Sequence, residues 1–183
     1  MVFAVNLIAY QIAWFSSVLG GANQMPWLGP LTVVIALALH LRAARRPFDE
    51  LLLAICCGVI GAGFDSVLVA LEWVSYPSGQ IGENFAPYWM ISLWVVFATT
   101  LNVSMRWMRI SPLLAAFFGF TGGPLTYWAG MELGAMELIN PTAAMIALAI
   151  GWGIMMPILT WLSEVLDGMP GRRRIWLAEG TKC

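Results

Sequence analysis

The chain has 183 residues, of which 60% are hydrophobic and only 10% are charged. A soluble domain of average composition carries about 25% charged residues, so this chain has too few charges to cover a soluble fold. The composition therefore predicts an integral membrane protein, for which the bilayer is the solvent. It disfavours nucleic-acid binding, a disulfide-stapled fold and disorder, because the chain has 9 basic residues, 3 cysteines and no polar low-complexity tract.

Apolar stretches long enough to cross a hydrocarbon core of ~30 Å, at ~1.5 Å per residue, occur along the whole chain. Two of them begin with an N-cap side chain and a proline, Ser111 before Pro112 and Asn140 before Pro141, which is typical of a helix start. We therefore expect an all-α membrane protein. The six transmembrane helices are predicted at 2–20, 27–41, 51–72, 87–105, 112–131 and 141–161.

The basic residues indicate which side of the membrane each loop faces. They follow the second, fourth and sixth stretches, and they are Arg42, Arg45, Arg46, Arg106, Arg109, Arg172, Arg173, Arg174 and Lys182. The intervening loops carry glutamates but no lysine or arginine. By the positive-inside rule, this asymmetry predicts a bundle with both termini in the cytoplasm. Residues 1–166 would form the transmembrane domain, and 167–183 a cytoplasmic basic tail on the anionic inner leaflet.

The longest outer connection runs over residues 73–86 and contains Pro77, Gly79 and Gly82. It is either a lid over a site or an ordinary connection between helices. Its length favours the ordinary connection.

Asp65 is the most informative residue, because it lies at hydrocarbon depth in the third stretch. An ionised side chain at the centre of a bilayer costs ~2.5–3.5 kcal/mol on insertion scales, so Asp65 should face protein or water. It lies beside a row of small residues at four-residue spacing, which is typical of a close helix interface. The row is Ala54, Gly58, Ala62, Ser66 and Ala70. Asp65 either lines a site for a solute, proton or lipid headgroup, or is a structural group hydrogen-bonded across that interface.

The first stretch offers polar groups that could share a site with Asp65. Gln11 lies near its middle, with Asn6, Ser16 and Ser17 at other depths. Amides and hydroxyls inside a membrane either bind a ligand or hold helices together, and both readings stay open.

The fifth stretch contains a proline that should bend it. Pro124 removes the hydrogen bond that the Phe120 carbonyl would accept, so we expect a kink. Backbone carbonyls near Gly123 and the Tyr127 hydroxyl could then face a cavity, as in helices broken at binding sites. The alternative is a bend that shapes the bundle and binds nothing.

Residues that would mark a metal, haem or redox site are scarce. His40 is the one histidine, and we expect it to reach toward the inner interface. Cys56 and Cys57 are adjacent and point ~100° apart on a helix, so they form no redox pair. No phosphate loop, nucleophile elbow or dinucleotide fingerprint occurs. The sequence therefore indicates no metal, no cofactor and no identifiable catalytic residue.

Two segments resemble a known family. The first contains Asn6, Tyr10-Gln11, Trp14-Phe15 and Val18-Leu19-Gly20. The second runs over 89–138 and contains FATTLN at 97–102, RW at 106–107, GGPLTYWAG at 122–130 and LGA at 133–135. These motifs are similar to those of the bacterial inner-membrane proteins known as domain of unknown function 2878. The resemblance implies a small multi-spanning protein of the bacterial inner (cytoplasmic) membrane without an established activity, and an association with lipid-modifying enzymes.

The candidate substrate-binding residues combine these observations, with Asn102 added as a polar member of the resembling segment. They are Asp65, Gln11, Tyr127, Gly123 and Asn102. We favour a protein that binds or transports a small or lipid-like molecule at a polar intramembrane site. One alternative is an accessory protein or enzyme of membrane-lipid modification, with Asp65, Glu132 or Glu137 as acid or base. The other is an assembly subunit that forms homo- or hetero-oligomers through its small-residue helix faces, with membrane lipids as its other partners.

Overall fold

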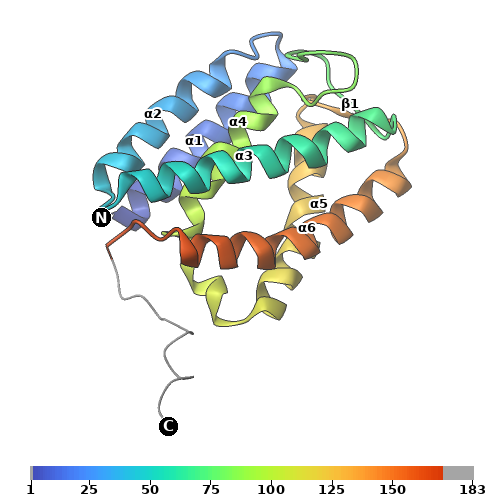
Figure 1. Cartoon of the computed structure of the whole chain (residues 1–183). Helices are drawn as coiled ribbons and strands as arrows, with labels where there is room; N and C mark the ends of the chain where they lie inside the picture. Colours follow the sequence, from blue (N-terminus) through green and yellow to red (C-terminus); the bar gives the residue numbers. More distant parts are fainter. Residues whose placement is uncertain (1, 171–183) are drawn as a thin grey trace.

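A computed structural model describes residues 2–170, which are mostly helical (Figure 1). A short 3₁₀ helix, Arg106–Ile110, precedes the fifth α-helix. The prediction of an all-α chain with six helices is confirmed for the described residues. The helices are α1 (Val2–Ala22), α2 (Leu28–Ala43), α3 (Pro47–Ala70), α4 (Tyr88–Leu101), α5 (Pro112–Glu132) and α6 (Pro141–Val165).

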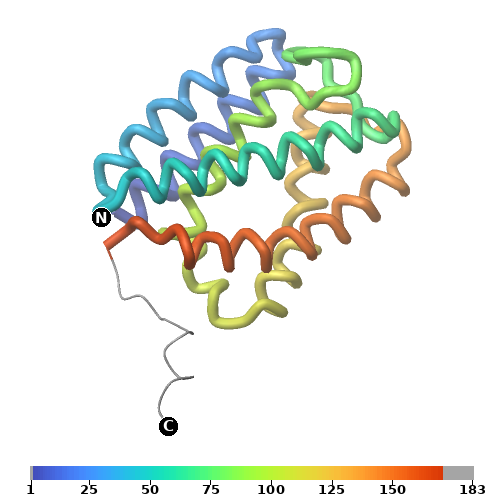
Figure 2. Tube along the Cα trace, viewed as in Figure 1, coloured from blue at the N-terminus to red at the C-terminus, as the bar shows by residue number. Residues whose placement is uncertain are grey.

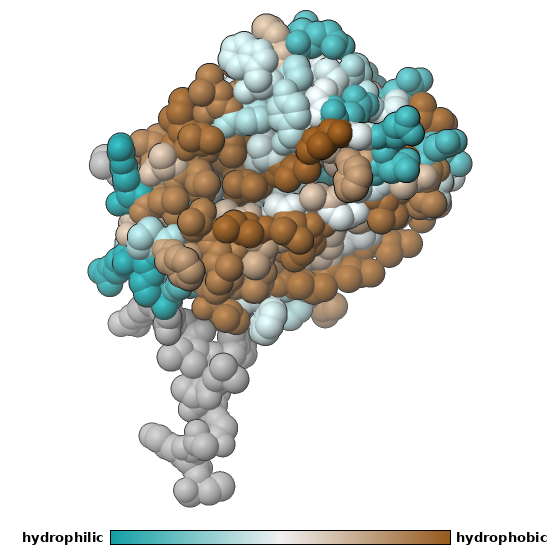
Figure 3. All heavy atoms as spheres, turned by 45° about the horizontal axis from the view of Figure 1, so that its top comes forward, coloured by the Kyte–Doolittle hydropathy of each residue, from teal (hydrophilic) through white to brown (hydrophobic). Residues whose placement is uncertain are grey.

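Three helices of the described chain, α1, α3 and α6, are long and apolar enough to cross a membrane, which indicates a membrane protein. The helices α2 and α4 are shorter and apolar. Hydrophobic residues form a broad band between hydrophilic residues at the two ends of the molecule (Figure 3). A surface of this kind is what a bilayer core requires.

The predicted proline starts of α5 and α6 are confirmed, but only one of the two predicted caps forms. The Asn140 side chain accepts a hydrogen bond from the Ala143 N–H at 3.2 Å. The Ser111 side chain makes no capping bond, so that prediction is wrong. The Ser111 backbone instead joins the 3₁₀ helix to α5, because its N–H donates to Met108 O at 3.4 Å and its carbonyl accepts from Ala115 N at 3.1 Å.

The helix α4 forms the centre of the fold, and most of its residues are buried. It packs against α1, α2 and α3, whereas α5 and α6 pack chiefly against each other as a hairpin (Figure 2). The molecule thus has a four-helix part and a two-helix part, and the candidate site lies where the two parts meet.

The loops at one end of the bundle are tied together by a short antiparallel pair of strands. β1 (Val74–Ser75) pairs with β2 (Glu137–Leu138), and Val74 lies opposite Leu138. The Ser78 hydroxyl, from the same loop as β1, donates to the Gly21 carbonyl at 2.7 Å. The connection over 73–86 is therefore packed onto the helix ends, as an ordinary connection would be.

The opposite end of the bundle carries the arginines of the described chain, which lie in the segments 42–46 and 106–109. Both segments meet the end of α6: Arg45 N–H donates to Gly168 O at 2.8 Å, and Arg109 Nε donates to Ser163 Oγ at 3.2 Å. The first residues of the predicted tail, Asp167 to Met169, are buried against the bundle. The remainder of the predicted basic tail, 171–183, lies outside the described residues.

Candidate functional site

Asp65 is completely buried, with 0% of its surface exposed, so the expectation that it faces protein is confirmed. Trp94 Nε1 donates to Asp65 Oδ2 at 2.7 Å, and the Tyr127 hydroxyl donates to Oδ1 at 2.5 Å. Each carboxylate oxygen thus accepts one hydrogen bond from a neutral donor. No basic side chain of the described chain forms an ion pair with Asp65.

Glycines create the space that the aromatic partners of Asp65 occupy. The Trp94 ring lies against Gly61, where a Cβ would come within 2.0 Å of ring atoms. The Trp152 ring lies against Gly123, where a Cβ would come within 2.3 Å. The two indole rings stack on each other, with centroids 4.4 Å apart and planes 15° apart. This stack and the bond from Tyr127 to Asp65 join the four-helix part to the hairpin.

A cavity of about 50 Å³ lies beside this arrangement, bounded by α1, α4, α5 and α6. A buried water needs ~10–15 Å³ by the same kind of measure, so the space exceeds that of a single water. None of its lining residues is charged, and half of them are aromatic. The aromatic residues are Tyr10, Trp14, Trp94, Phe97, Tyr127 and Trp152. Asp65 does not line the cavity itself but lies directly behind two residues that do.

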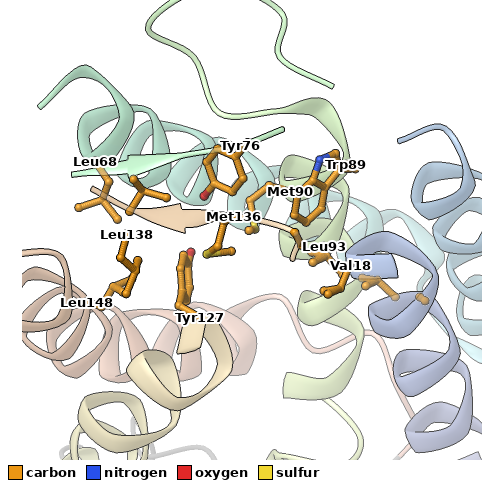
Figure 4. Packing of buried hydrophobic residues seen from close by; sticks show 14 of the residues in the cluster. Val18, Leu68, Tyr76, Trp89, Met90, Leu93, Tyr127, Met136, Leu138 and Leu148 are labelled. Carbon is orange, nitrogen blue, oxygen red and sulfur yellow. The ribbon is translucent and has the colours of Figure 1, made fainter. Parts of the chain in front are cut away.

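Tyr76, from the loop after β1, adds a hydroxyl that sequence reasoning missed. Its oxygen is buried and has no hydrogen-bond partner among the described residues. Burial, and next the nearby Asp65 carboxylate, raise the pKa of Tyr76 well above its ordinary value, so the hydroxyl stays protonated. Figure 4 shows Tyr76 and Tyr127 approaching the same region, with Met136 between them.

Two predicted site residues do not join Asp65. Gln11 is exposed on the outer face of α1, beside Leu7 and Ile12, because α1 turns a different stripe toward the bundle. From that inner stripe, Asn6 Nδ2 donates to the Thr99 carbonyl at 3.1 Å, which links α1 to α4. The helix α5 continues through Pro124, so it is not broken in the way of helices at some binding sites, and the kink stays a prediction.

Asn102 belongs instead to a buried polar network at the arginine end of the bundle. The centre of this network is Glu50, which is 2% exposed. His40 Nε2 lies 2.7 Å from Glu50 Oε2, while Asn102 Nδ2 and the Gly168 N–H donate to Oε1 at 2.6 and 2.7 Å. The expectation that His40 reaches toward the interface is wrong, because Glu50 offers it a buried acceptor.

Asp167 forms the second half of the network. Arg106 Nη2 donates to both of its carboxylate oxygens at 2.7 Å, and Arg109 Nη1 donates to Oδ2 at 2.9 Å. Arg109 also donates to Asn102, which connects the two halves. The network therefore holds the end of α6 to the four-helix part. Its contacts are explained by this structural role and do not require a ligand.

No match was found among the curated proteins or among the solved structures. The model of a family described as protein of unknown function (DUF2878) matches residues 3–158. The matched segment includes Asp65, its two donors Trp94 and Tyr127, and the cavity between them and α1. The resemblance seen in the sequence is confirmed, and the chain belongs to the DUF2878 family of proteins of unknown function.

Proposed function

We propose that the protein binds a small or lipid-like molecule in the cavity beside Asp65. The observation that carries this proposal is an unfilled space lined by apolar and aromatic side chains, two of which are held by a buried carboxylate. Ligand sites are typically concave, mostly apolar and supplied with a few fixed polar groups. Packed interiors leave few voids larger than a water molecule, so a space of this size needs an explanation.

The proposed way into the cavity is from the side, between α1 and α5. Both helices line the cavity, they make few contacts with each other, and the lining residue Thr126 is exposed. A molecule dissolved in the bilayer can enter between these two helices. The volume accommodates a headgroup or the end of a chain, so the remainder of a lipid-like ligand would extend through this opening.

The proposal includes six transmembrane spans in a bacterial inner membrane, with both termini in the cytoplasm. The arginines gathered at one end of the described bundle support this orientation under the positive-inside rule. The cavity then lies in the outer half, on the side of β1 and β2. If the C-terminus is cytoplasmic, a fluorescent-protein fusion to it should be fluorescent and an alkaline phosphatase fusion to it should be inactive. The reverse result would refute the orientation.

The two alternative functions receive less support from the geometry. Glu132 and Glu137 are exposed, and the hydrogen-bond partners of Asp65 in the described chain are Trp94 and Tyr127, so the geometry does not join these glutamates to Asp65 as an acid–base site. Gly58, Gly119 and Gly123, the glycines of the small-residue helix faces that an assembly subunit could use for docking, are buried inside the bundle. Binding of a ligand by the cavity is therefore the proposal that uses the observed features best.

The test compares two glycine substitutions on α5. Gly130→Leu adds a side chain to a cavity-lining position, where the nearest atom is the flexible end of Met136 at 3.2 Å. Gly122→Leu makes the same change where a Cβ would meet nothing within 4 Å, outside the cavity lining. Native mass spectrometry of protein purified from its own membranes should show a bound molecule in the wild type and in Gly122→Leu, but not in Gly130→Leu. A wild type without any bound molecule, or equal occupancy in both variants, would refute the proposal.

A further inference from the structure

We infer that the ligand is a cationic amphiphile, with an alkylammonium head seated in the cavity and an apolar tail that leaves between α1 and α5. The proposed function is assumed here, and the new element is that the ligand carries a positive charge. The first observation is that Asp65 has no positively charged partner. The carboxylate is fully buried, its two hydrogen-bond donors are neutral, and no basic side chain lines the cavity.

The positive charges of the described chain are all at the other end of the bundle. The arginine segments 42–46 and 106–109 meet the end of α6, and His40 is paired with Glu50. Arg46 pairs there with Asp49, and Arg106 and Arg109 pair with Asp167. A buried carboxylate without a paired cation is costly in a medium of low dielectric constant, so a positively charged ligand close to Asp65 would be bound favourably.

The aromatic lining supplies the second part of the recognition. Tryptophan, tyrosine and phenylalanine rings attract a cation within about 6 Å of their faces, and the attraction grows when water is excluded. The rings cluster closely: the Phe97 centroid lies 5.4 Å from that of Trp152 and 6.4 Å from that of Tyr10. An aromatic enclosure backed by a carboxylate is suited to an ammonium group carrying alkyl substituents, because such a group needs few hydrogen-bond acceptors.

The two lining residues that bind Asp65, Tyr127 and Trp94, use their polar hydrogens for these bonds and have none left for a ligand. The one lining side-chain N–H of the described chain that is buried without a partner is Trp152 Nε1. A neutral hydrocarbon would fill the space but would leave the carboxylate without a counter-charge.

The experiment measures charge selectivity by calorimetry in neutral maltoside micelles. The probes are decyltrimethylammonium and decyldimethylamine N-oxide, which share the chain and the alkylated nitrogen but differ in net charge. The wild type should bind the cation at least about tenfold more tightly, which corresponds to ~1.4 kcal/mol. Titrations into empty micelles provide the partition baseline. Decylphosphocholine is the third probe. If the natural ligand is a zwitterionic lipid headgroup, decylphosphocholine should bind as tightly as the cation. If the ligand is a free lipophilic amine, decylphosphocholine should bind more weakly.

Two variants that each remove one negative charge test whether the preference for the cation depends on Asp65. Asp65→Asn should remove the preference for the cation, and Asp49→Asn should keep it, since Asp49 pairs with Arg46 at the opposite end of the bundle. If Asp65→Asn does not fold, Thr126→Lys places a fixed cation at the exposed mouth of the cavity and should weaken binding of the cationic probe selectively, by about tenfold or more.

The outcomes separate this inference from the proposed function. Equal affinity for both probes in the wild type would overturn the cationic ligand, as would a preference that survives in Asp65→Asn. Absence of binding by either probe would overturn it too. In each case the native mass spectrometry of Gly130→Leu and Gly122→Leu still decides whether the cavity holds a ligand of another class.

Discussion

The seating of Trp94 on Gly61 can be tested by adding one methyl group. In Gly61→Ala, the new Cβ would lie 2.0 Å from ring atoms of Trp94. The ring cannot yield easily, because its Nε1 is bonded to Asp65 and its face stacks on Trp152 at 4.4 Å. Gly63→Ala is the matched control, two positions further along α3, where a Cβ would meet nothing within 4 Å.

The two variants should change stability in opposite directions. Replacing glycine by alanine inside a helix stabilises it by ~0.5–1 kcal/mol, which is the whole effect expected for Gly63→Ala. In Gly61→Ala, overpacking costs ~1–3 kcal/mol and the loss of a hydrogen bond to a charged acceptor costs ~1.5–3 kcal/mol. After the helix gain is subtracted, the net loss is ~2–5 kcal/mol.

Thermal unfolding in maltoside micelles, followed by tryptophan fluorescence, measures both effects. A change of 1 kcal/mol shifts Tm by ~2–4 °C in a chain of 150–250 residues, so Gly61→Ala should lower Tm by ~4–20 °C. Gly63→Ala should raise Tm by ~1–4 °C. If Gly61→Ala were as stable as Gly63→Ala, the Trp94 ring would not be seated on this glycine, and the described support of Asp65 would be refuted.

Further predictions concern the polar network and the helix starts. Asp167→Asn should destabilise the fold by up to ~3–5 kcal/mol, because it removes the buried carboxylate that pairs with the partly buried Arg106 and Arg109. Asp49→Asn should cost ~1 kcal/mol or less, because the side chains of Asp49 and Arg46 are 25% and 46% exposed; equal losses for both aspartates would contradict the burial of the network. Asn140→Ala should cost ~1 kcal/mol through loss of its cap, whereas Ser111→Ala, which loses no cap, should stay within ~0.5 kcal/mol. A larger loss for Ser111→Ala in the same unfolding assay would mean that this side chain does cap α5.

The features that could be predicted from sequence depend on local physical rules. The proline starts of α5 and α6 follow from the missing N–H of proline, which costs nothing at the first helical position. The inward orientation of Asp65 follows from the cost of a charge in lipid and from the adjacent small-residue row. That Asp65 and Tyr127 belong to one site was a hypothesis from the sequence, and the structure brings the two side chains into direct contact. Their role toward a ligand stays a prediction.

The features that could not be predicted depend on which face of a helix packs and on distant contacts. A transmembrane helix is apolar on nearly every side, so the pattern of α1 did not reveal that Gln11 faces outward. The polar network joins residues far apart in sequence: Glu50 and Gly168 are separated by 118 positions. The prediction that groups Asn102 with Asp65 therefore missed its contact with Glu50. One signal was available, since Glu50 and Asp167 are acidic residues on the side that carries the arginines.

The central claim is that the space between α1 and α5 is a binding site, and an experimental map of the protein in lipid nanodiscs tests it most directly. We predict a non-protein feature beside Tyr127 and Trp152 that continues toward Thr126 and is missing in Gly130→Leu. A map in which α1 closes against α5, or in which side chains alone fill this volume, would contradict the proposal and leave Asp65 as a structural group.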